Sequence, residues 1–511
     1  MSMVTPKNRK AEHNYVVGLF VIFLSLPLAF RVIAPLTEPY GRKPFTPQPT
    51  LSALANNEPS DVFETFSNAQ FERSIAVKTA ISLKNKAQYH LLNYLDTEQV
   101  ISGTDGWLFY KPQFLDGTCY RDQRLSFLGH RIQTFVSMAR TVDIPVDISM
   151  SPDKATVYPD RLHPRSRWLT ACHSANSTKL RTIMRARVPD LIDHYDAIIP
   201  HKGNDKLYYQ TDTHWTEIGA TYALRQLANR MLSVPEDDQQ SILDDFDIGE
   251  TKKVTDLAAI SLLGQPEKLI SLSDRSREHI KTSLLKIRKE VVFIHDSFYG
   301  TLQVFKFFPK ARTFNRGNKT MARILVSELK DNAAKRLVFN AVDRNFVSRM
   351  EHYFVSAPKV MDAVTTRNGA LAKQICPAGT QQDQYPHSVQ YRNMVPRQEP
   401  NAMPRGRGKF TATTNDPILI LQTKEPIRGQ CLKISIEVTK ADRVKIYLPP
   451  FHRTTDVRPW EEGRTLTYRL KPGVNDVHLV LPRNLRGHKL RIDPINTKAP
   501  FGLTTLAVFR P

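Results

Sequence analysis

The chain has 511 residues, 41% of them hydrophobic, and its 72 Lys and Arg outnumber 50 Asp and Glu, which gives a formal charge of +22. This length excludes a single small domain, so we expect two folded domains, and the apolar fraction suffices for globular packing. The positive charge favours an anionic partner and leaves nucleic acid, anionic lipid and acidic glycan as alternatives.

The segment from Tyr15 to Phe30 is almost wholly apolar and follows Lys7, Arg9 and Lys10, and the apolar run resumes after Arg31 as far as Pro35. About 20 apolar residues cross a bilayer as one helix, and the preceding basic residues favour a cytoplasmic N-terminus. A buried core helix and a cleaved signal peptide are the alternatives, but no small-residue cleavage site stands out. We therefore expect residues 1–35 to form a cytoplasmic tail and a transmembrane helix, with the rest of the chain outside the cytoplasm.

Residues 36–66 are punctuated by prolines and predict an extended spacer. A helix is expected at about 68–95, and from Gly106 short apolar strands alternate with helical patterns, which is typical of an α/β sheet. Strands are predicted at 107–110, 144–150, 291–294 and 337–341, and a polar insertion of uncertain structure at about 232–278. We place the α/β domain at residues 67–365.

Residues 366–409 are rich in Gln, Pro, Gly and Arg and predict a linker. Residues 410–511 contain β-rich segments separated by turn residues, without helical periodicity, and predict a small β-sandwich or jelly roll. The expected strands are 417–421, 431–439, 443–448, 465–470 and 476–481.

The four cysteines fall into two pairs, one on each side of the middle of the chain. Four cysteines allow three connectivities, and an exported protein can oxidise them. Proximity within the predicted domains favours disulfides between Cys119 and Cys172 and between Cys376 and Cys431. Their spacings do not resemble a zinc cluster.

Two short stretches carry the candidate chemistry, Tyr208–Trp215 (YYQTDTHW) and Val291–Phe298 (VVFIHDSF). Ser297 follows a hydrophobic strand on a turn into a helix, where α/β folds place reactive groups. A serine nucleophile needs a base, and a histidine base needs a carboxylate that fixes its tautomer. Asp212 and His214 can supply both from one loop, so Ser297, His214 and Asp212 are the candidate catalytic residues.

Each of these residues has a structural alternative. A serine in a tight turn often serves the turn alone, and Asp212 and His214 can cap the helix that begins near Thr216. We expect His295 to support the site without acting as the base, and Trp215 to belong to the core. An Asp–His pair also binds metals, but no further ligands follow at suitable spacing, so no metal is predicted.

Four motifs in order resemble the periplasmic alginate O-acetyltransferase group of SGNH hydrolase-like proteins: Gly106–Phe109, Ser151–Asp160, Asp212–Trp215 and His295–Phe298. The resemblance covers about residues 100–350. In that family the D-x-H-W motif precedes the serine, the reverse of the order in ordinary SGNH esterases. The resemblance therefore implies a circularly permuted SGNH-like α/β domain.

The resemblance implies that Ser297 is the nucleophile, His214 the general base and acid, and Asp212 the residue that orients His214. His295 stands where the family usually has the glycine of G-D-S-F. The loss of glycine restricts this turn and leaves the oxyanion hole unassigned, although His295 still provides a backbone donor. The family often carries a carbohydrate-binding β-domain, which agrees with the expected β-sandwich. It also implies a periplasmic enzyme anchored in the inner membrane.

Residues 401–511 contain 20 Lys and Arg against nine Asp and Glu, a surplus that favours an acidic polysaccharide as the partner of this domain. Nucleic acid is not expected, because the predicted topology places the domain outside the cytoplasm. We expect transfer of an acetyl group from a membrane-bound donor protein to a sugar hydroxyl through a serine acyl-enzyme, without a cofactor. A polysaccharide esterase and a catalytically silent glycan-binding scaffold are the alternatives.

Overall fold

The structure is a computed structural model that describes residues 75–115, 119–188, 190–232, 248–284, 290–301, 307–308, 311–315, 318–330, 336–376, 388–397, 408–451 and 460–509. The predicted transmembrane segment at 15–35 and the spacer at 36–66 lie outside these residues. Within the described part of the chain, no helix is both long enough and apolar enough to span a bilayer.

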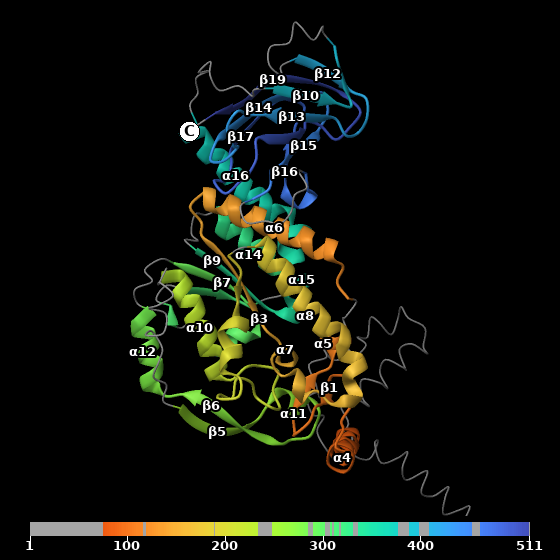
Figure 1. Ribbon diagram of the computed structural model, residues 1–511, viewed down its shortest axis with the longest axis vertical. Coiled ribbons are helices and arrows are strands. Elements are labelled where there is room, and N and C mark those ends of the chain that lie inside the picture. Colours follow the sequence, from red (N-terminus) through yellow and green to blue (C-terminus); the bar gives the residue numbers. More distant parts are fainter. Residues whose placement is uncertain are drawn as a thin grey trace, which may run out of the picture.

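The centre of the first domain is a parallel five-stranded sheet in the order β4-β3-β9-β7-β8 (Figure 1). Its strands are β3 (Val146–Ser151), β4 (Ile192–Asp193), β7 (Val291–Ile294), β8 (Ala311–Phe314) and β9 (Arg336–Val342). Every residue of β3 and β7 is buried, and so is every residue of β9 except its first, Arg336. Such burial is expected for a sheet that is covered on both faces. The α/β domain predicted from the sequence is therefore confirmed.

Alternating side chains of β7 enter two separate cores. Val292 and Ile294 belong to a cluster that includes apolar residues of α6, α8 and α14–α16, whereas Val291 and Phe293 belong to a cluster with α10 and α13. Successive side chains of a strand point to opposite faces, so this apolar run supports both helical layers at once. The helices of the domain are α4 (Ile75–Leu92), α5 (Pro112–Leu115), α6 (Asp122–Thr141), α7 (Lys154–Val157), α8 (Arg167–Arg187), α9 (His194–Ile198), α10 (Glu217–Leu232), α11 (Asp256–Ile260), α12 (Asp274–Leu284), α13 (Ser297–Thr301), α14 (Asn318–Lys330), α15 (Asp343–Glu351) and α16 (Pro358–Ile375).

Two small β-ribbons complete the domain. Strands β1 (Val100–Ser102) and β2 (Leu108–Tyr110) pair antiparallel, as do β5 (Ile248–Val254) and β6 (Pro266–Leu272). The second ribbon and α11 lie in the segment predicted as a polar insertion. In Figure 1 they lie at the end of the domain that is turned away from the C-terminal domain.

The C-terminal domain is a sandwich of two five-stranded antiparallel sheets, ordered β10-β13-β18-β15-β16 and β11-β12-β19-β14-β17. Their strands are β10 (Ser388–Arg392), β11 (Met394–Pro396), β12 (Gly408–Ala412), β13 (Ile418–Gln422), β14 (Cys431–Val438), β15 (Asp442–Tyr447), β16 (Thr465–Leu470), β17 (Gly473–Val480), β18 (Lys489–Asp493) and β19 (Pro500–Phe509). The predicted β-rich C-terminal region is therefore confirmed.

The segment predicted as a linker, 366–409, contains ordered secondary structure instead. Helix α16 continues through residue 365 to Ile375, and β10 and β11 pair with β13 and β12. The composition of this segment was misleading because its few apolar positions, such as Met394, become buried only when β11 joins the sandwich beside β12. The domain limit at 365 accordingly falls inside a helix.

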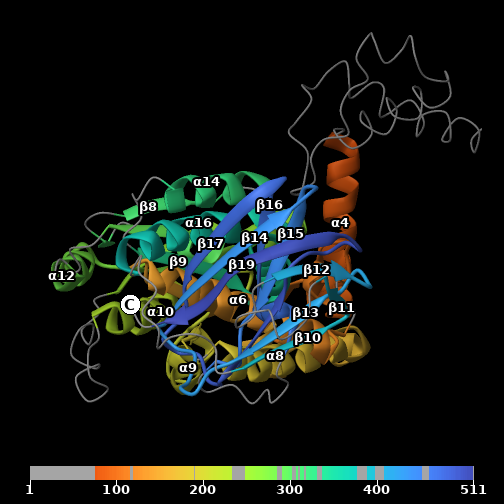
Figure 2. The same ribbon diagram turned by 90° about the horizontal axis from the view of Figure 1, so that it is seen from above.

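The two domains share one continuous core. Viewed from above, the strands of the sandwich lie over α6 and α16 (Figure 2), and a single cluster of buried apolar side chains extends from the α/β sheet into the sandwich. Polar groups join them as well: the Asn368 side chain accepts from Val480 N at 2.8 Å and donates to Val480 O at 3.0 Å. Arg131 Nη1 donates to Thr465 O at 2.7 Å. These contacts hold the domains in a fixed arrangement.

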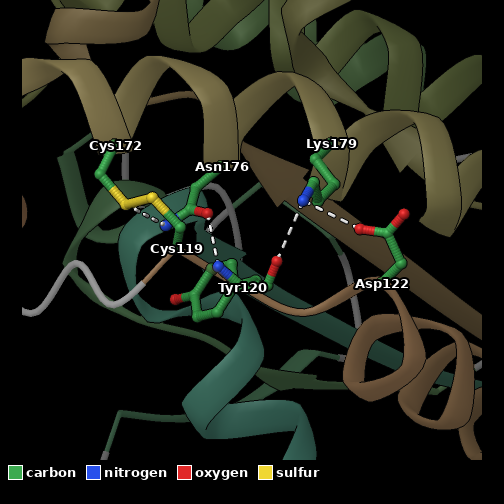
Figure 3. The surroundings of a disulfide bond; sticks show 6 residues. All are labelled: Cys119, Tyr120, Asp122, Cys172, Asn176 and Lys179. Atoms are coloured by element: carbon green, nitrogen blue, oxygen red, sulfur yellow. Dashed lines mark hydrogen bonds and ion pairs between the residues drawn. A yellow bond between two sulfur atoms is a disulfide. The ribbon is translucent and has the colours of Figure 1, made fainter.

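Both predicted disulfides are present. Cys119–Cys172 joins the segment before α6 to α8 (Figure 3), and Cys376–Cys431 joins the end of α16 to β14. The first lies within the α/β domain, whereas the second reinforces the contact between α16 and the sandwich.

Candidate active site

Ser297 is the first residue of α13 and follows β7 after a two-residue turn. Asp296 fixes that turn, because its Oδ1 accepts from Phe298 N at 3.0 Å and its Oδ2 accepts from Val342 N at 2.7 Å. The carboxylate of Asp296 thus ties the end of β7 to the end of β9. Ser297 itself is half-buried at the carboxyl edge of the sheet.

His214 lies between Ser297 and Asp212. Its Nε2 is 2.8 Å from Ser297 Oγ, and its Nδ1 is 2.7 Å from Asp212 Oδ1. The three residues predicted from the sequence therefore form a continuous chain of hydrogen bonds. The same carboxylate oxygen also accepts from His214 N at 2.9 Å, so it restrains both the backbone and the ring of the histidine.

Asp212 is held through both of its oxygens. While Oδ1 faces His214, Oδ2 accepts from Asp256 N at 3.2 Å. Burial opposes ionisation of this carboxyl, but the hydrogen bond and charge of His214 hold its pKa well below the usual range. The ionised carboxylate selects the tautomer in which Nδ1 carries a proton and Nε2 can accept one from Ser297.

The β5–β6 insertion supports the loop that carries Asp212 and His214. Glu267 on β6 accepts from Gln210 N at 2.7 Å and from Thr211 N at 2.8 Å. Asp256, at the start of α11, accepts from Thr213 N at 2.8 Å and from Thr213 Oγ1 at 2.6 Å. The insertion therefore fixes the backbone on both sides of Asp212, which its polar sequence did not reveal.

Asp256 adds a second carboxylate beside the histidine. Its Oδ2 lies 3.7 Å from His214 Nδ1. Burial, followed by the negative charge of Asp212, raises the pKa of Asp256. When it is ionised, a second carboxylate at this distance stabilises a protonated imidazole at His214.

Lys154, which belongs to the Ser151–Asp160 motif, also supports this loop. The motif precedes the loop in the sequence, whereas the β5–β6 insertion follows it. The ammonium of Lys154 donates to the backbone oxygens of Gln210 at 3.0 Å and Asp212 at 2.6 Å, and also to that of Tyr209 at 3.2 Å. The residue is only 2% exposed. Burial lowers the pKa of Lys154 to about 8, although Asp212 and Asp256 oppose this shift.

Two aromatic residues form the base of the site. Trp215 is fully buried and donates from Nε1 to Phe298 O at 2.9 Å, and the Phe298 ring lies 5.3 Å from the His214 ring. Trp215 is thus a core residue, as expected. It joins the histidine loop to the serine turn.

His295 also supports the site, as expected. Its Nδ1 contacts Asp296 O at 2.6 Å, and its Nε2 is within hydrogen-bond distance of Thr313 Oγ1. The backbone N–H of His295 donates to Phe314 O at 3.1 Å and is therefore not available to an oxyanion. This hydrogen bond continues the pairing of β7 with β8 by one residue beyond the end of β7.

Asp212, His214 and Asp256 bring three potential metal-ligand atoms within 4.8 Å of one another. Only Asp212 and His214 are neighbours in the sequence, since Asp256 comes from the insertion. In this geometry the carboxylate oxygens accept hydrogen bonds from His214, Thr213 and the backbone. The arrangement fits a proton-transfer site, in which each of these oxygens already has a donor.

Part of the α/β domain is similar to a known protein family. Residues 100–281 match the model of the family described as "SGNH hydrolase-like domain, acetyltransferase AlgX". No curated protein matches this chain.

Three solved structures illustrate the similarity. The O-acetyltransferase domain of Pseudomonas putida AlgJ is 18% identical, with 48% of this chain and 92% of that chain covered and a TM-score of 0.33. Pseudomonas aeruginosa AlgX is 13% identical, with 81% and 94% covered and a TM-score of 0.33. Bacillus cereus PatB1 is 12% identical, with 50% and 99% covered and a TM-score of 0.34. The match of residues 100–281 agrees with the resemblance drawn from the motifs: this part of the chain is similar to SGNH hydrolase-like domains of the acetyltransferase type, and the match ends before Ser297.

Proposed function

We propose that this protein is a polysaccharide O-acetyltransferase that works through an acyl-enzyme on Ser297. The observation that carries the proposal is the hydrogen-bond chain from Ser297 Oγ through His214 to Asp212, at 2.8 and 2.7 Å. Such a chain activates a serine for nucleophilic attack. The family match supports acetyl as the transferred group.

In the first step, Ser297 Oγ attacks the carbonyl carbon of the acetyl donor, and its proton passes to His214 Nε2. The donor's leaving oxygen departs with that proton, and acetyl-Ser297 remains. In the second step, His214 Nε2 removes the proton from a sugar hydroxyl, whose oxygen attacks the acetyl carbonyl. Ser297 Oγ leaves and regains its proton from His214, so the enzyme is restored. Asp212 and Asp256 stabilise the imidazolium of both steps.

The sandwich supplies a surface that supports glycan binding. A groove of about 810 Å³ lies between its strands and loops. Its lining includes Trp460, Lys424, Arg486, His488 and Lys489, and no acidic residue is among the described residues that line it. Aromatic rings stack on sugar rings, while Arg and Lys pair with carboxylates along an acidic polymer. We propose that this groove holds a uronate-type polysaccharide.

The remaining parts of the proposal follow from the sequence. The apolar segment 15–35 anchors the enzyme in the inner membrane, and the domains face the periplasm. Two disulfides suit an oxidising compartment. The acetyl donor is a membrane-bound protein, because no motif for a soluble activated donor occurs in the sequence. The catalytic domain has the circularly permuted SGNH order, with Asp212 and His214 ahead of Ser297.

A transfer assay tests the proposal. Purified protein receives a small acetyl ester as donor and short oligouronates as acceptors, and acetylated oligosaccharide is measured by mass spectrometry. Wild type and the exposed-serine control Ser348→Ala should form product, whereas Ser297→Ala should lose about three orders of magnitude in rate. Release of free acetate without sugar acetylation would favour the esterase alternative. Equal rates for wild type and Ser297→Ala would refute the assignment.

A further inference from the structure

A second pocket lies in the α/β domain, between β2, α5, α8 and the start of α15. It encloses about 120 Å³. A water molecule needs about 10–15 Å³ of such volume, so the pocket has the scale of a small polar molecule or one sugar ring. Its lining includes Tyr110, Gln113, Tyr120, Asn176, Asp343 and Arg344.

One buried donor in this pocket lacks a partner. Gln113 is 8% exposed, and its side-chain nitrogen Nε2 has no hydrogen-bond partner among the described residues. Buried polar groups in folded proteins are nearly always hydrogen-bonded, and an unsatisfied donor costs about 1–3 kcal/mol. Gln113 also lines the cavity, so rotation of its side-chain amide can present this donor to a ligand oxygen.

The charges around the pocket are balanced within the protein. Asp343 Oδ2 lies 3.1 Å from Arg181 Nη2 and accepts from Ser177 Oγ at 3.0 Å. Arg344 pairs with the buried carboxylate of Asp153. With its ions already paired, the pocket favours hydroxyl groups over a free anion. The tyrosine rings add apolar surface suited to the face of a pyranose.

A disulfide fixes one wall of the pocket (Figure 3). Cys119 directly precedes Tyr120, whose backbone N–H donates to Asn176 Oδ1 at 2.7 Å, and Asn176 lies one helical turn after Cys172. Lys179 Nζ donates to Tyr120 O at 3.2 Å. The bridge and these hydrogen bonds hold the wall in place before a ligand arrives, which lowers the entropy cost of binding.

The pocket adjoins the candidate triad through Phe298. The guanidinium carbon of Arg344 lies 5.4 Å from the centre of the Phe298 ring, and the His214 ring lies 5.3 Å from the same ring. Phe298 follows Ser297 directly in the chain. The fully buried Phe298 ring therefore lies between the pocket and the candidate triad.

We propose that this pocket binds one hydroxyl-bearing pyranose unit of the acceptor glycan, adjacent to the unit that receives the acetyl group. Gln113 Nε2 donates to a sugar oxygen, and Tyr110 and Tyr120 contact the ring. The assignment rests on the proposed function for its role in transfer, but sugar binding in the pocket can be measured without catalysis.

The test uses the full-length protein with Gln113→Glu, which keeps the side-chain size but replaces the donor, and Gln113→Leu as a second variant. Exposed Gln123→Leu on α6 is the matched control. Each substitution is combined with Ser297→Ala, and binding of short oligouronates and short neutral gluco-oligosaccharides is measured by calorimetry. Loss of one hydrogen bond to a buried site should weaken binding of at least one probe about tenfold. The control should bind as the Ser297→Ala parent does.

The kinetic arm uses the same substitutions with Ser297 intact. Gln113→Glu should raise the KM for the acceptor about tenfold and leave hydrolysis of a small acetyl ester within about twofold of wild type. Sugar binding that depends on Gln113 in a protein that transfers no acetyl group would support the pocket and refute the proposed function. The pocket assignment would be overturned if the folded Gln113 variants bound both probes as tightly as the Ser297→Ala parent. It would also be overturned if neither the parent nor the variants bound either probe.

Discussion

The carboxylate of Asp256 lies 3.7 Å from Nδ1 of His214, the nitrogen that contacts Asp212. The other charged groups near this imidazole are Asp212 itself and Lys154, whose ammonium contacts the Asp212 carbonyl oxygen, with Glu267 and Lys206 beyond it. A negative charge at this distance stabilises protonated His214.

Replacement of Asp256 by Asn should therefore move the acidic limb of kcat/KM to lower pH. The amide oxygen can still accept from Thr213 N, and the NH2 group can donate to Thr213 Oγ1, but the charge is removed. Protonated His214 therefore becomes less stable, and the active base persists at lower pH. We expect a shift of about 0.5–1 pH unit, measured with a small acetyl ester. Exposed Glu250→Gln on the same insertion should leave the limb in place. An unchanged limb in Asp256→Asn would show that this carboxylate acts only on the loop backbone.

Replacement of Lys154 by Met should impair the site and alter the pH dependence of stability. Three loop carbonyls lose their shared donor, so kcat for the small ester should fall about 10- to 100-fold. Exposed Lys84→Met should retain wild-type kcat. If Lys154→Met kept the wild-type kcat, the proposal that Lys154 positions the histidine loop would be contradicted.

The stability effect has a definite sign. The pKa of Lys154 is lowered to about 8, below its unfolded value, so the unfolded chain binds more protons between about pH 8 and 10. The free energy of unfolding of wild type should therefore rise across this range relative to Lys154→Met, by about 1–2 kcal/mol. Urea unfolding at both pH values measures this difference. A fall in wild type relative to the variant would exclude a lowered pKa.

Replacement of Trp460 by Ala should weaken binding of acidic polymer about tenfold while leaving small-ester hydrolysis unchanged, because the groove of the sandwich is separate from the triad residues. Binding of wild type should also weaken as salt increases, since several Lys and Arg contribute. Exposed Tyr391→Ala in the same domain is the matched aromatic control. If Trp460→Ala bound the polymer as tightly as wild type, and if salt did not change binding, the glycan would bind outside this groove.

Replacement of Asn368 by Ala should destabilise both domains together. Asn368 is fully buried and satisfies both backbone groups of Val480 across the domain contact. We expect the free energy of unfolding to fall by about 1–3 kcal/mol, with one transition for both domains. Exposed Asn204→Ala should leave it unchanged. Separate transitions in wild type would contradict the shared core. Because the two domains share this core, removal of the sandwich at residue 365 would also disturb the α/β domain and is a poor test of glycan binding.

Much of the fold and site follows from local sequence patterns. The apolar run 291–294 and the turn at 295–298 predicted β7 and the position of Ser297, and residues 465–470 predicted β16 with its observed bounds. The spacing of Asp212 and His214 in one loop predicted their contact, because the intervening residue lets both side chains turn to the same side.

The parts that the sequence did not predict depend on distant contacts. Asp256 and Glu267 reach the histidine loop only through the antiparallel pairing of β5 with β6, and their polar surroundings carry no periodic signal. Strand β19 is interrupted by glycine and threonine and pairs with β14 across a register shift, so its sequence alone is ambiguous. Lys154 was visible in a motif, but its burial under the loop required the tertiary structure.

Trapping of the acyl-enzyme tests the central claim most directly. Wild type, Ser348→Ala and Ser297→Ala are mixed with excess small acetyl ester, quenched in acid, and analysed by intact-mass and peptide mass spectrometry. The account predicts one added acetyl group on the peptide that contains Ser297 in wild type and in Ser348→Ala, and none at position 297 in Ser297→Ala. Addition of acceptor before quenching should remove that acetyl group from the enzyme and place it on the sugar. Acetylation of the sugar by an enzyme that never carries acetyl on Ser297, or by Ser297→Ala at the wild-type rate, would contradict the account.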